Sequence, residues 1–190
     1  MKKLLVIPVL VLALAGCGTA QWIKMAQQIL PVVLPMITNL VTAVVLLEGK
    51  TVPTADVNTI SATANQVSAD LNLVGQLVDQ YQTSPNVTTV EKINAALADV
   101  QTHLNGLLPA LHITDPATVQ KITAITTLIA SETNAFEQIL PLVSNAQGRS
   151  GAASAVPLSA KQLKKEYDAI VSQASSSPQV NAAFAGAKLK

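Results

Sequence analysis

Apolar side chains recur at alternating steps of three and four residues over residues 54–82, which is the spacing of one face of a long helix. The members of this seam are Val57, Ile60, Ala64, Val67, Leu71, Val74, Val78 and Tyr81. The spacing returns in Val90, Ile93, Leu97, Val100, Leu104, Leu107 and Leu111, and again in Val119, Ile122, Ile129, Phe136, Leu140 and Val143. Sustained heptads predict helices that pack nearly aligned, with interdigitating side chains.

Short breaks separate these helical stretches. Residues 84–86 form the first break and residues 113–115 the second. Connections of this length predict that successive helices run antiparallel. Almost nothing in the chain has the alternation of a strand. We therefore predict an all-α fold, an antiparallel helical bundle of about four long helices over residues 21–143, with a short C-terminal helix after it.

Capping residues mark the expected starts of three helices. The pairs are Thr88 with Glu91, Asp115 with Pro116, and Ser159 with Gln162. A hydroxyl followed three residues later by Glu or Gln is a capping box, and Asp before Pro suits an N-cap and first turn. Two threonines in the fourth stretch, Thr126 and Thr133, lie in register with its seam. Such threonines usually bond their own backbone four residues back rather than line a pocket.

The first helix, predicted over residues 21–47, allows two interpretations because it is almost uncharged between Lys24 and Glu48. Polar residues and prolines recur on it at three- and four-residue steps: Lys24, Gln28, Pro31, Pro35, Asn39 and Thr42. In a bundle this stripe faces water, and the prolines bend the helix on its exposed side. We favour that arrangement. The alternative is a membrane-embedded helix over residues 25–47, or a bundle that opens around a hydrophobic ligand.

The C-terminal part differs in composition from the bundle. Residues 144–158 are rich in Ser, Ala and Gly and read as a flexible linker. Residues 159–190 follow as a short basic helix and tail. The helix has a narrow apolar stripe, Leu163, Tyr167, Ile170 and Ala174. Residues 179–190 are expected to be mobile or weakly helical.

Charge is scarce and unevenly distributed. Only 12% of the chain is charged, about half the usual share of roughly 25%. Residues 18–148 carry four Lys and nine acidic residues, a net charge of −5, whereas residues 149–190 carry six basic and two acidic residues, a net charge of +4. Aromatic residues make up 3%, too few for the stacking platforms of single-stranded nucleic-acid binders. We expect no nucleic-acid partner.

Five lysines give the tail its charge: Lys161, Lys164, Lys165, Lys188 and Lys190. Three of them fall within one helical turn. They are candidates for contact with an anionic surface, such as lipid headgroups, phosphate-bearing wall polymers or an acidic partner. The alternative is a solvated helix face that keeps a weakly charged protein soluble.

Signatures of catalysis are lacking. The chain has no Gly-rich phosphate loop, no Gly-x-Ser-x-Gly and no His-Glu-x-x-His. Asp99 and His103 lie one helical turn apart, which predicts a surface contact rather than half a metal site. His112 has no partner evident from the sequence. We expect no enzyme, no catalytic residue, no metal and no cofactor beyond covalent lipid.

The N-terminal residues have the organisation of an export signal. Two lysines precede the apolar run of residues 4–15, which is shorter than the roughly 20 residues that span a bilayer. The run ends in Leu14, Ala15, Gly16 and Cys17. This box resembles the lipobox of bacterial lipoproteins, a likeness confined to residues 1–17. The resemblance implies removal of a signal peptide, residues 1–16, and diacylglycerol on the Cys17 thiol, with the new amino group acylated by a fatty acid such as palmitate.

The lipobox also predicts a location. Residues 17–20 become a lipidated N-terminus that ties the protein to a membrane of the cell envelope. Gly18, where an Asp resembles an inner-membrane retention mark, favours the outer membrane facing the periplasm in a Gram-negative cell. Cys17 is the single cysteine, so no intrachain disulfide forms. The expected function is a non-enzymatic structural or interaction module, with an envelope protein or peptidoglycan as candidate partner.

The overall arrangement also resembles the murein lipoprotein in its N-terminal lipid, heptad helices and C-terminal Lys190. In that family the terminal lysine is joined to peptidoglycan. The ending here, residues 187–190, departs from the usual Tyr-Arg-Lys-like pattern. The resemblance therefore concerns the architecture rather than the covalent linkage.

Overall fold

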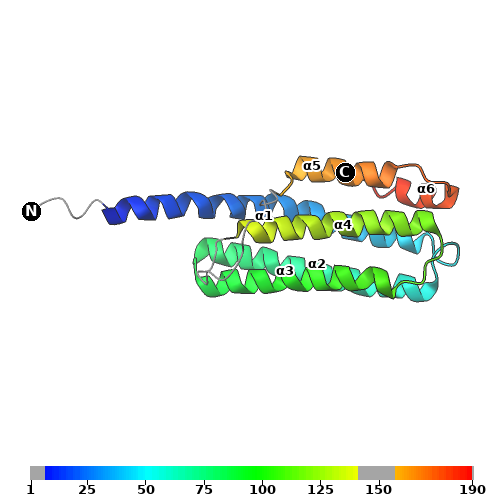
Figure 1. Cartoon of the computed structure of the whole chain (residues 1–190), viewed down its shortest axis with the longest axis horizontal. Coiled ribbons are helices and arrows are strands. Elements are labelled where there is room, and N and C mark those ends of the chain that lie inside the picture. The colour runs from blue at the N-terminus through cyan, green and yellow to red at the C-terminus, as the bar shows by residue number, and fades with distance from the viewer. Residues whose placement is uncertain (1–6, 141–156, 190) are drawn as a thin grey trace, which may run out of the picture.

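The computed structural model of the protein describes residues 7–140 and 157–189, with side chains from residue 21 onward (Figure 1). Its helices are α1 (Ile7–Val45), α2 (Thr54–Thr83), α3 (Val87–Leu107), the 3₁₀ turn η1 (Leu108–Ala110), α4 (Pro116–Ile139), α5 (Ala160–Ser172) and α6 (Pro178–Ala185). The described residues contain no strand beyond an isolated bridge between Glu48 and Val52. The predicted all-α fold is confirmed.

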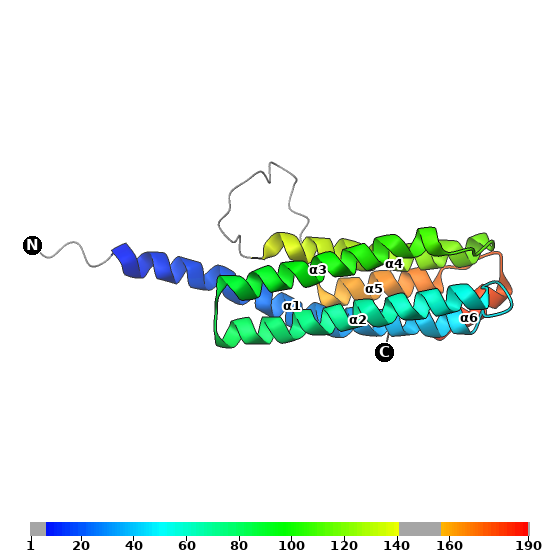
Figure 2. The same cartoon turned by 90° about the horizontal axis from the view of Figure 1, so that it is seen from below.

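The four long helices form an up-and-down bundle. Figures 1 and 2 show α1 to α4 running alternately in opposite directions, and α4 returns to lie beside α1. The N-terminal part of α1 projects beyond the end of this bundle. α5 lies along α1 and α4, and α6 turns back to pack on α5 and α1. We call α5 and α6 together the α5–α6 hairpin.

The seams read from the sequence account for most of the bundle core. Every predicted position on α2 is buried, as are all those on α3 up to Leu107. The fourth seam was wrong at Val119, which is 37% exposed. Val143 lies outside the described residues. Thr126 and Thr133 donate to the carbonyl oxygens of their own helix four residues back, at 2.9 and 2.8 Å, as expected.

α4 has a wider buried face than its heptad seam predicts. A second row at steps of three and four is also buried: Thr118, Lys121, Ile125, Leu128, Glu132 and Ala135. Lys121 and Glu132 of this row contact the end of α5 and the residue before it, whereas Thr118 contacts Thr51 in the segment between α1 and α2. Two charged residues interrupt the row, so its apolar periodicity is hard to see in the sequence.

α1 is a bundle helix whose polar stripe faces outward. Lys24, Gln28, Pro31, Pro35 and Thr42 are exposed, and the helix passes through both prolines without interruption. Their missing backbone donors lie on the side away from the core, where they disturb the packing least. Asn39 departs from this pattern, because it is half-buried beneath the α5–α6 hairpin.

Aromatic side chains close the end of the bundle from which α1 projects. Trp22 packs on Tyr81 and Phe136, with ring centroids 5.1 and 6.3 Å apart. The three residues come from α1, α2 and α4. Trp22 is 2% exposed and is among the first core side chains of the described chain. The bundle proper therefore starts at about this residue.

The start of α3 differs from the prediction. Asn86 is the N-cap, and its Oδ1 accepts from the amide of Thr89 at 2.8 Å. The predicted capping box of Thr88 and Glu91 is wrong, because the helix begins one residue before Thr88. Asn86 sits in extended conformation directly after Pro85, where its short side chain reaches the third helical amide. The other two predicted caps, Asp115 and Ser159, are confirmed.

The C-terminal tail, expected to be mobile or weakly helical, forms the helix α6 over Pro178–Ala185 and packs against the bundle over the described residues. Val180 and Phe184 of α6 are fully buried, and Ala187 is nearly so. The few hydrophobic residues of this short segment pack against α5 and α1. Lys190 and residues 144–156 of the expected linker lie outside the described residues. Of its remaining two residues, Pro157 is buried, and Leu158 is held by a hydrogen bond to α4.

Candidate functional site

Cys17 lies in the part of α1 that projects beyond the bundle, together with Leu14, Ala15 and Gly16. Trp22 is five positions further along the helix, which corresponds to about 7.5 Å at a rise of 1.5 Å per residue. A lipid attached at Cys17 would therefore hold the aromatic end of the bundle close to a bilayer surface.

α1 itself has the composition of a spanning segment. Over Gln21–Val45 it is long and apolar enough to cross a membrane, with a mean hydropathy of 1.9. A core helix of a soluble protein and a signal sequence meet the same criterion. In the structure its apolar face packs against the other helices, and Val33, Met36 and Val44 are 0–3% exposed.

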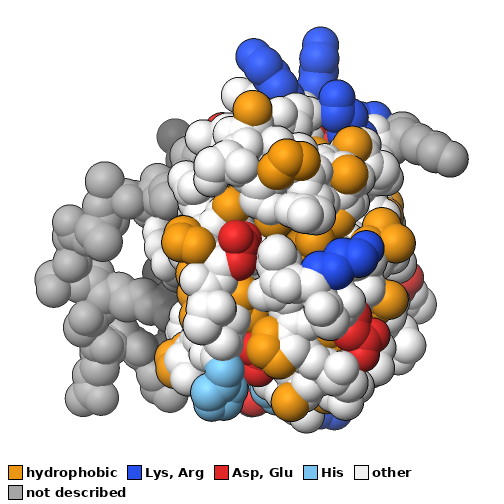
Figure 3. All heavy atoms as spheres, turned by 90° about the vertical axis from the view of Figure 1, so that its right-hand side faces the viewer, with side chains coloured by type: hydrophobic (Ala, Val, Ile, Leu, Met, Phe, Trp, Pro, Cys, Tyr) orange, Lys and Arg blue, Asp and Glu red, His pale blue; other side chains and the backbone are white. Residues whose placement is uncertain are grey.

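The tail lysines are on the outer surface of the α5–α6 hairpin. Lys161, Lys165 and Lys188 are exposed and Lys164 is half-buried, while Lys190 is outside the described residues. Basic side chains gather at the edge of the molecule formed by α5 and α6 (Figure 3). Of the two acidic residues of α5, Glu166 is exposed beside Lys165, and Asp168 accepts from the amide of Leu189 at 2.9 Å. The four described lysines therefore lie on a hairpin that packs against the bundle, and their contact with an anionic surface stays a prediction.

The position of α5 along the bundle separates these lysines from Cys17. Glu132 binds Leu158, just before α5, and also lines a cavity with Ala26 and Val33 of α1. The start of α5 is therefore about 14 to 24 Å further along the axis than Cys17. This distance exceeds the Debye length of about 8 Å at physiological salt. An upright bundle would hold the lysines beyond the field of the anchoring membrane.

Lys121 of α4 is a buried cation that the sequence did not single out. Its Nζ donates to the carbonyl oxygens of Ile170, Val171 at 3.3 Å and Gln173 at 2.5 Å, at the C-terminal end of α5. The ring of Phe184 lies 5.9 Å from it. Burial lowers the pKa of Lys121. A cation at a helix C-terminus satisfies carbonyls left unpaired there and suits the helix dipole.

Glu132 holds the opposite end of α5. It is 4% exposed, and its Oε2 accepts from the amide of Leu158 at 2.9 Å. Burial raises the pKa of Glu132, the Leu158 amide lowers it by a smaller amount, and the charge of Glu166 raises it further. Lys121 and Glu132 are both members of the second buried row of α4.

Asn39 and Tyr167 complete the polar contacts beneath the hairpin. Asn39 donates from Nδ2 to the carbonyl oxygen of Ala187 at 2.9 Å. The Tyr167 hydroxyl is fully buried and makes no hydrogen bond of good geometry. Burial raises the pKa of Tyr167, while the neighbouring Asn39 side chain opposes that increase. Polar groups from α1 and α4 therefore contact the hairpin before α5, at the C-terminal end of α5 and after α6.

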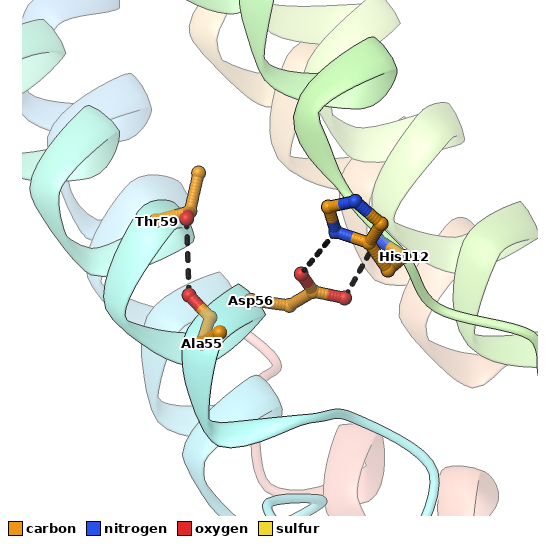
Figure 4. A network of polar contacts seen from close by, with 4 residues as sticks. All are labelled: Ala55, Asp56, Thr59 and His112. Atoms are coloured by element: carbon orange, nitrogen blue, oxygen red, sulfur yellow. Dashed lines mark hydrogen bonds and ion pairs between the residues drawn. The ribbon is translucent and has the colours of Figure 1, made fainter.

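Both histidines pair with aspartates on α2. The sequence had predicted a contact of His103 with Asp99 and had indicated no partner for His112. His103 Nδ1 lies 3.0 Å from Asp70 Oδ2, not against Asp99. His112 donates its backbone amide to Asp56 at 2.8 Å, and its ring Nδ1 lies 3.3 Å from the same carboxylate (Figure 4). Residues distant in sequence meet because α2 and α3 are antiparallel.

These pairs are structural contacts. Asp56 is 1% exposed and joins the start of α2 to the segment that follows η1, whereas the His112 ring is largely in solvent. In the described part of the chain, no three His, Cys, Asp or Glu side chains gather as a metal ion would require. Figure 4 shows the neighbouring Thr59 turned to the carbonyl of Ala55 in its own helix, not to the pair.

Two small, partly open pockets lie between the bundle helices in the described part of the chain. One, of about 20 Å³, is lined mainly by apolar side chains of α1 to α4, with Glu132 at its edge. The other, of about 10 Å³, lies between Ile37, Ile60 and Leu104. A cavity of roughly 10–15 Å³ holds about one water molecule. Neither is large enough for a lipid chain in this closed form.

Comparison of the chain with protein-family models, with curated proteins and with solved structures found no significant match. The site assignments therefore rest on the residues of this chain alone.

Proposed function

We propose that the protein is a lipid-anchored, non-enzymatic helical-bundle lipoprotein that acts as a structural or interaction module of the cell envelope. The observation that carries this proposal is the position of Cys17. It ends a lipobox-like sequence, Leu14 to Cys17, and lies in the segment of α1 that projects beyond the bundle. A lipid at this point would anchor the protein without disturbing the helix packing that begins at Trp22.

The character of the bundle supports a role for its surface rather than its interior. The described cavities have room for single water molecules, and the buried ionisable groups Asp56, Lys121 and Glu132 are engaged with backbone atoms. Groups held in this way stabilise contacts between helices. The surface offers the lysines of α5 and the segment after α6 as a means of recognition.

The proposed anchor and the lysines together define an orientation. With Cys17 in the periplasm-facing leaflet of the outer membrane, the aromatic end of the bundle faces that membrane and the hairpin faces the periplasm. The lysines would then meet an anionic envelope polymer, peptidoglycan above all, and not the anchoring bilayer. Each lysine near an anionic surface contributes about 1 kcal/mol, so the cluster orients the protein while the lipid retains it.

A second candidate is a membrane-active protein in which residues 25–47 enter the bilayer. The hydropathy of α1 favours it. It requires α1 to leave its contacts with α2 and α4, because the side chains that would face lipid are those that fill the core in this structure.

Cell fractionation and sedimentation test the proposal. The wild-type protein should remain with membranes in high salt and be released by detergent, whereas a chain of residues 17–190 with Cys17→Ser, which has neither the lipid nor the signal segment, should be soluble. Unlipidated protein should then sediment with isolated peptidoglycan, and less so when Lys161, Lys164 and Lys165 are replaced by Gln. Replacing Lys24, Lys50 and Lys92 by Gln is the matched control. Equal sedimentation of both triple variants would remove peptidoglycan recognition by α5, and membrane binding by residues 17–190 with Cys17→Ser would favour the second candidate.

A further inference from the structure

The turn between α2 and α3, residues 84–88, carries an exposed apolar side chain. Val87, the first residue of α3, is 56% exposed, more than any other large hydrophobic side chain in the described residues. Asn86 fixes the shape of the turn, because its side chain accepts from the amide of Thr89 at 2.8 Å and donates to the carbonyl oxygen of Ser84 at 2.9 Å. Val87 is therefore presented to solvent by a turn that its own hydrogen bonds hold in shape.

The surface around Val87 is uncharged. Residues 80–90 contain no Asp, Glu, Lys or Arg, and the charged residues nearest to them are Asp79 and Glu91. The other exposed side chains of this stretch are those of Pro85 and of Gln, Thr, Ser and Asn residues. Moving a charged side chain out of water is costly, whereas an uncharged surface enters a lipid headgroup layer without that cost. The turn is therefore suited to contact with lipid.

The turn lies at the end of the bundle from which α1 projects (Figures 1 and 2). Trp22 of α1 marks the level, because its ring packs on that of Tyr81 with centroids 5.1 Å apart. From Tyr81, α2 continues two residues to Thr83, about 3 Å along the axis, before the turn begins. Cys17 is five positions from Trp22 in the same direction, about 7.5 Å. Cys17 and the turn are therefore within about 5 Å of each other along the bundle axis.

We propose that the α2–α3 turn rests in the phospholipid headgroup layer that holds the lipid of Cys17, with the Val87 side chain inserted in it. A bilayer with a hydrocarbon core of about 30 Å measures about 40–45 Å in all, so each headgroup layer is about 5–7 Å thick and the turn reaches it. Anchored through α1 alone, the bundle is free to tilt, whereas a second contact between α2 and α3 holds it upright. The inference rests on the proposed lipid anchor and deepens it by naming a second membrane-binding element.

The experiment supplies the anchor chemically, so that it does not depend on lipidation in a cell. Residues 17–190 contain one cysteine, Cys17, whose thiol is coupled to a maleimide-bearing phospholipid in phosphatidylcholine vesicles. A photo-crosslinking analogue of phenylalanine replaces Val87 or, as matched controls, Leu46 or Leu73, which are 54% and 45% exposed. Because all three positions are exposed, the fold should be kept, and circular dichroism verifies this. Mass spectrometry measures the lipid crosslinked to the protein.

Position 87 should crosslink to phospholipid about tenfold more than position 46, which lies about 44 Å from Cys17 along the axis of α1 and outside the headgroup layer. Position 73, about 15 Å before the turn, should resemble position 46. Added phosphatidylglycerol should leave the yield at position 87 unchanged, because the turn is uncharged.

Equal yields at the three positions would overturn the proposal, because the turn would then have no preferred contact with lipid. Crosslinking at position 87 only in the presence of phosphatidylglycerol would also overturn it, because a basic residue such as Lys24 would then make the contact. Since the anchor is attached chemically, either failure is distinct from a failure of the lipoprotein assignment.

Discussion

Lys121 of α4 donates from Nζ to the carbonyl oxygen of Gln173, 2.5 Å away, at the residue that caps the C-terminus of α5. The two residues are 52 positions apart in the sequence. The contact places a buried positive charge where a helix leaves carbonyl groups unpaired. It joins the C-terminal hairpin to the long-helix bundle, and the hairpin should loosen when it is removed.

Replacing Lys121 by Met should lower the free energy of unfolding by about 1–3 kcal/mol. Methionine fills a similar volume but leaves buried carbonyl oxygens at the end of α5 without a donor, which costs about that amount. Urea unfolding followed by circular dichroism measures the change. Lys92→Met, at an exposed position of α3, is the control and should shift stability by about 0.5 kcal/mol or less. Equal effects of the two variants would contradict the capping role.

Glu132 should make stability depend on pH between about 4 and 7. Burial raises its pKa above the ordinary value of 4.5, so the folded protein holds this proton more tightly than the unfolded chain does. The stability that Glu132 contributes is therefore greatest below pH 4.5 and is lost as pH rises through the raised pKa. Each unit by which the pKa is raised is equivalent to about 1.4 kcal/mol.

Glu132→Gln keeps an oxygen acceptor for the Leu158 amide and removes the charge. The variant should match the wild type near pH 4 and be more stable near pH 7, with the difference growing over that interval. Urea unfolding at several pH values measures it. Glu91→Gln, exposed on α3, controls for the loss of one negative charge. A wild type that is the more stable at pH 7 would contradict the expected sign.

The sequence predicted the parts of the fold that depend on one helix and its nearest partner. The α2 seam is confirmed from Val57 to Tyr81, because side chains at heptad spacing can be buried along one face only. The caps Asp115 and Ser159 are also confirmed, since a cap depends on residues within the same turn. The expectation that the polar stripe of α1 faces water was right except at Asn39.

The contact between the α5–α6 hairpin and α4 was not predictable in the same way, because the α4 residues that hydrogen-bond to the hairpin are charged. In the sequence Lys121 and Glu132 look like solvated positions of an amphipathic helix. They become buried only because α5 packs on α4, and the sequence between the two helices indicated a separate tail. Only the spacing indicated this second buried face of α4, because Ile125, Leu128 and Ala135 continue the steps of three and four around Lys121 and Glu132.

Leu97→Ala should destabilise the bundle by about 2–5 kcal/mol, the usual range for emptying a core leucine site. Leu97 is 2% exposed and lines the cavity of about 20 Å³, so truncation enlarges an existing void. Denaturant unfolding gives the value. Leu73→Ala, at a position 45% exposed, should cost far less. A change below about 1 kcal/mol at Leu97 would mean that α3 does not pack as described.

Proteolysis with liposomes separates the two candidate functions. If α1 is a bundle helix, unlipidated protein should be soluble without detergent and strongly helical, and liposomes should leave its cleavage pattern unchanged. The side chains of its buried face fill the bundle core, so insertion would require these contacts to open. Selective protection of residues 25–47 by liposomes, identified by mass spectrometry of the fragments, would contradict the soluble bundle and support the membrane-active alternative.

Lipid at Cys17 is the central claim, and metabolic labelling with a fatty acid in a bacterial host tests it directly. The wild-type protein should incorporate the label, and mass spectrometry should find its N-terminus at Cys17 with acyl chains attached. Cys17→Ser should incorporate none and should keep residues 1–16. An unlabelled wild-type protein with a free thiol at Cys17 would contradict the assignment.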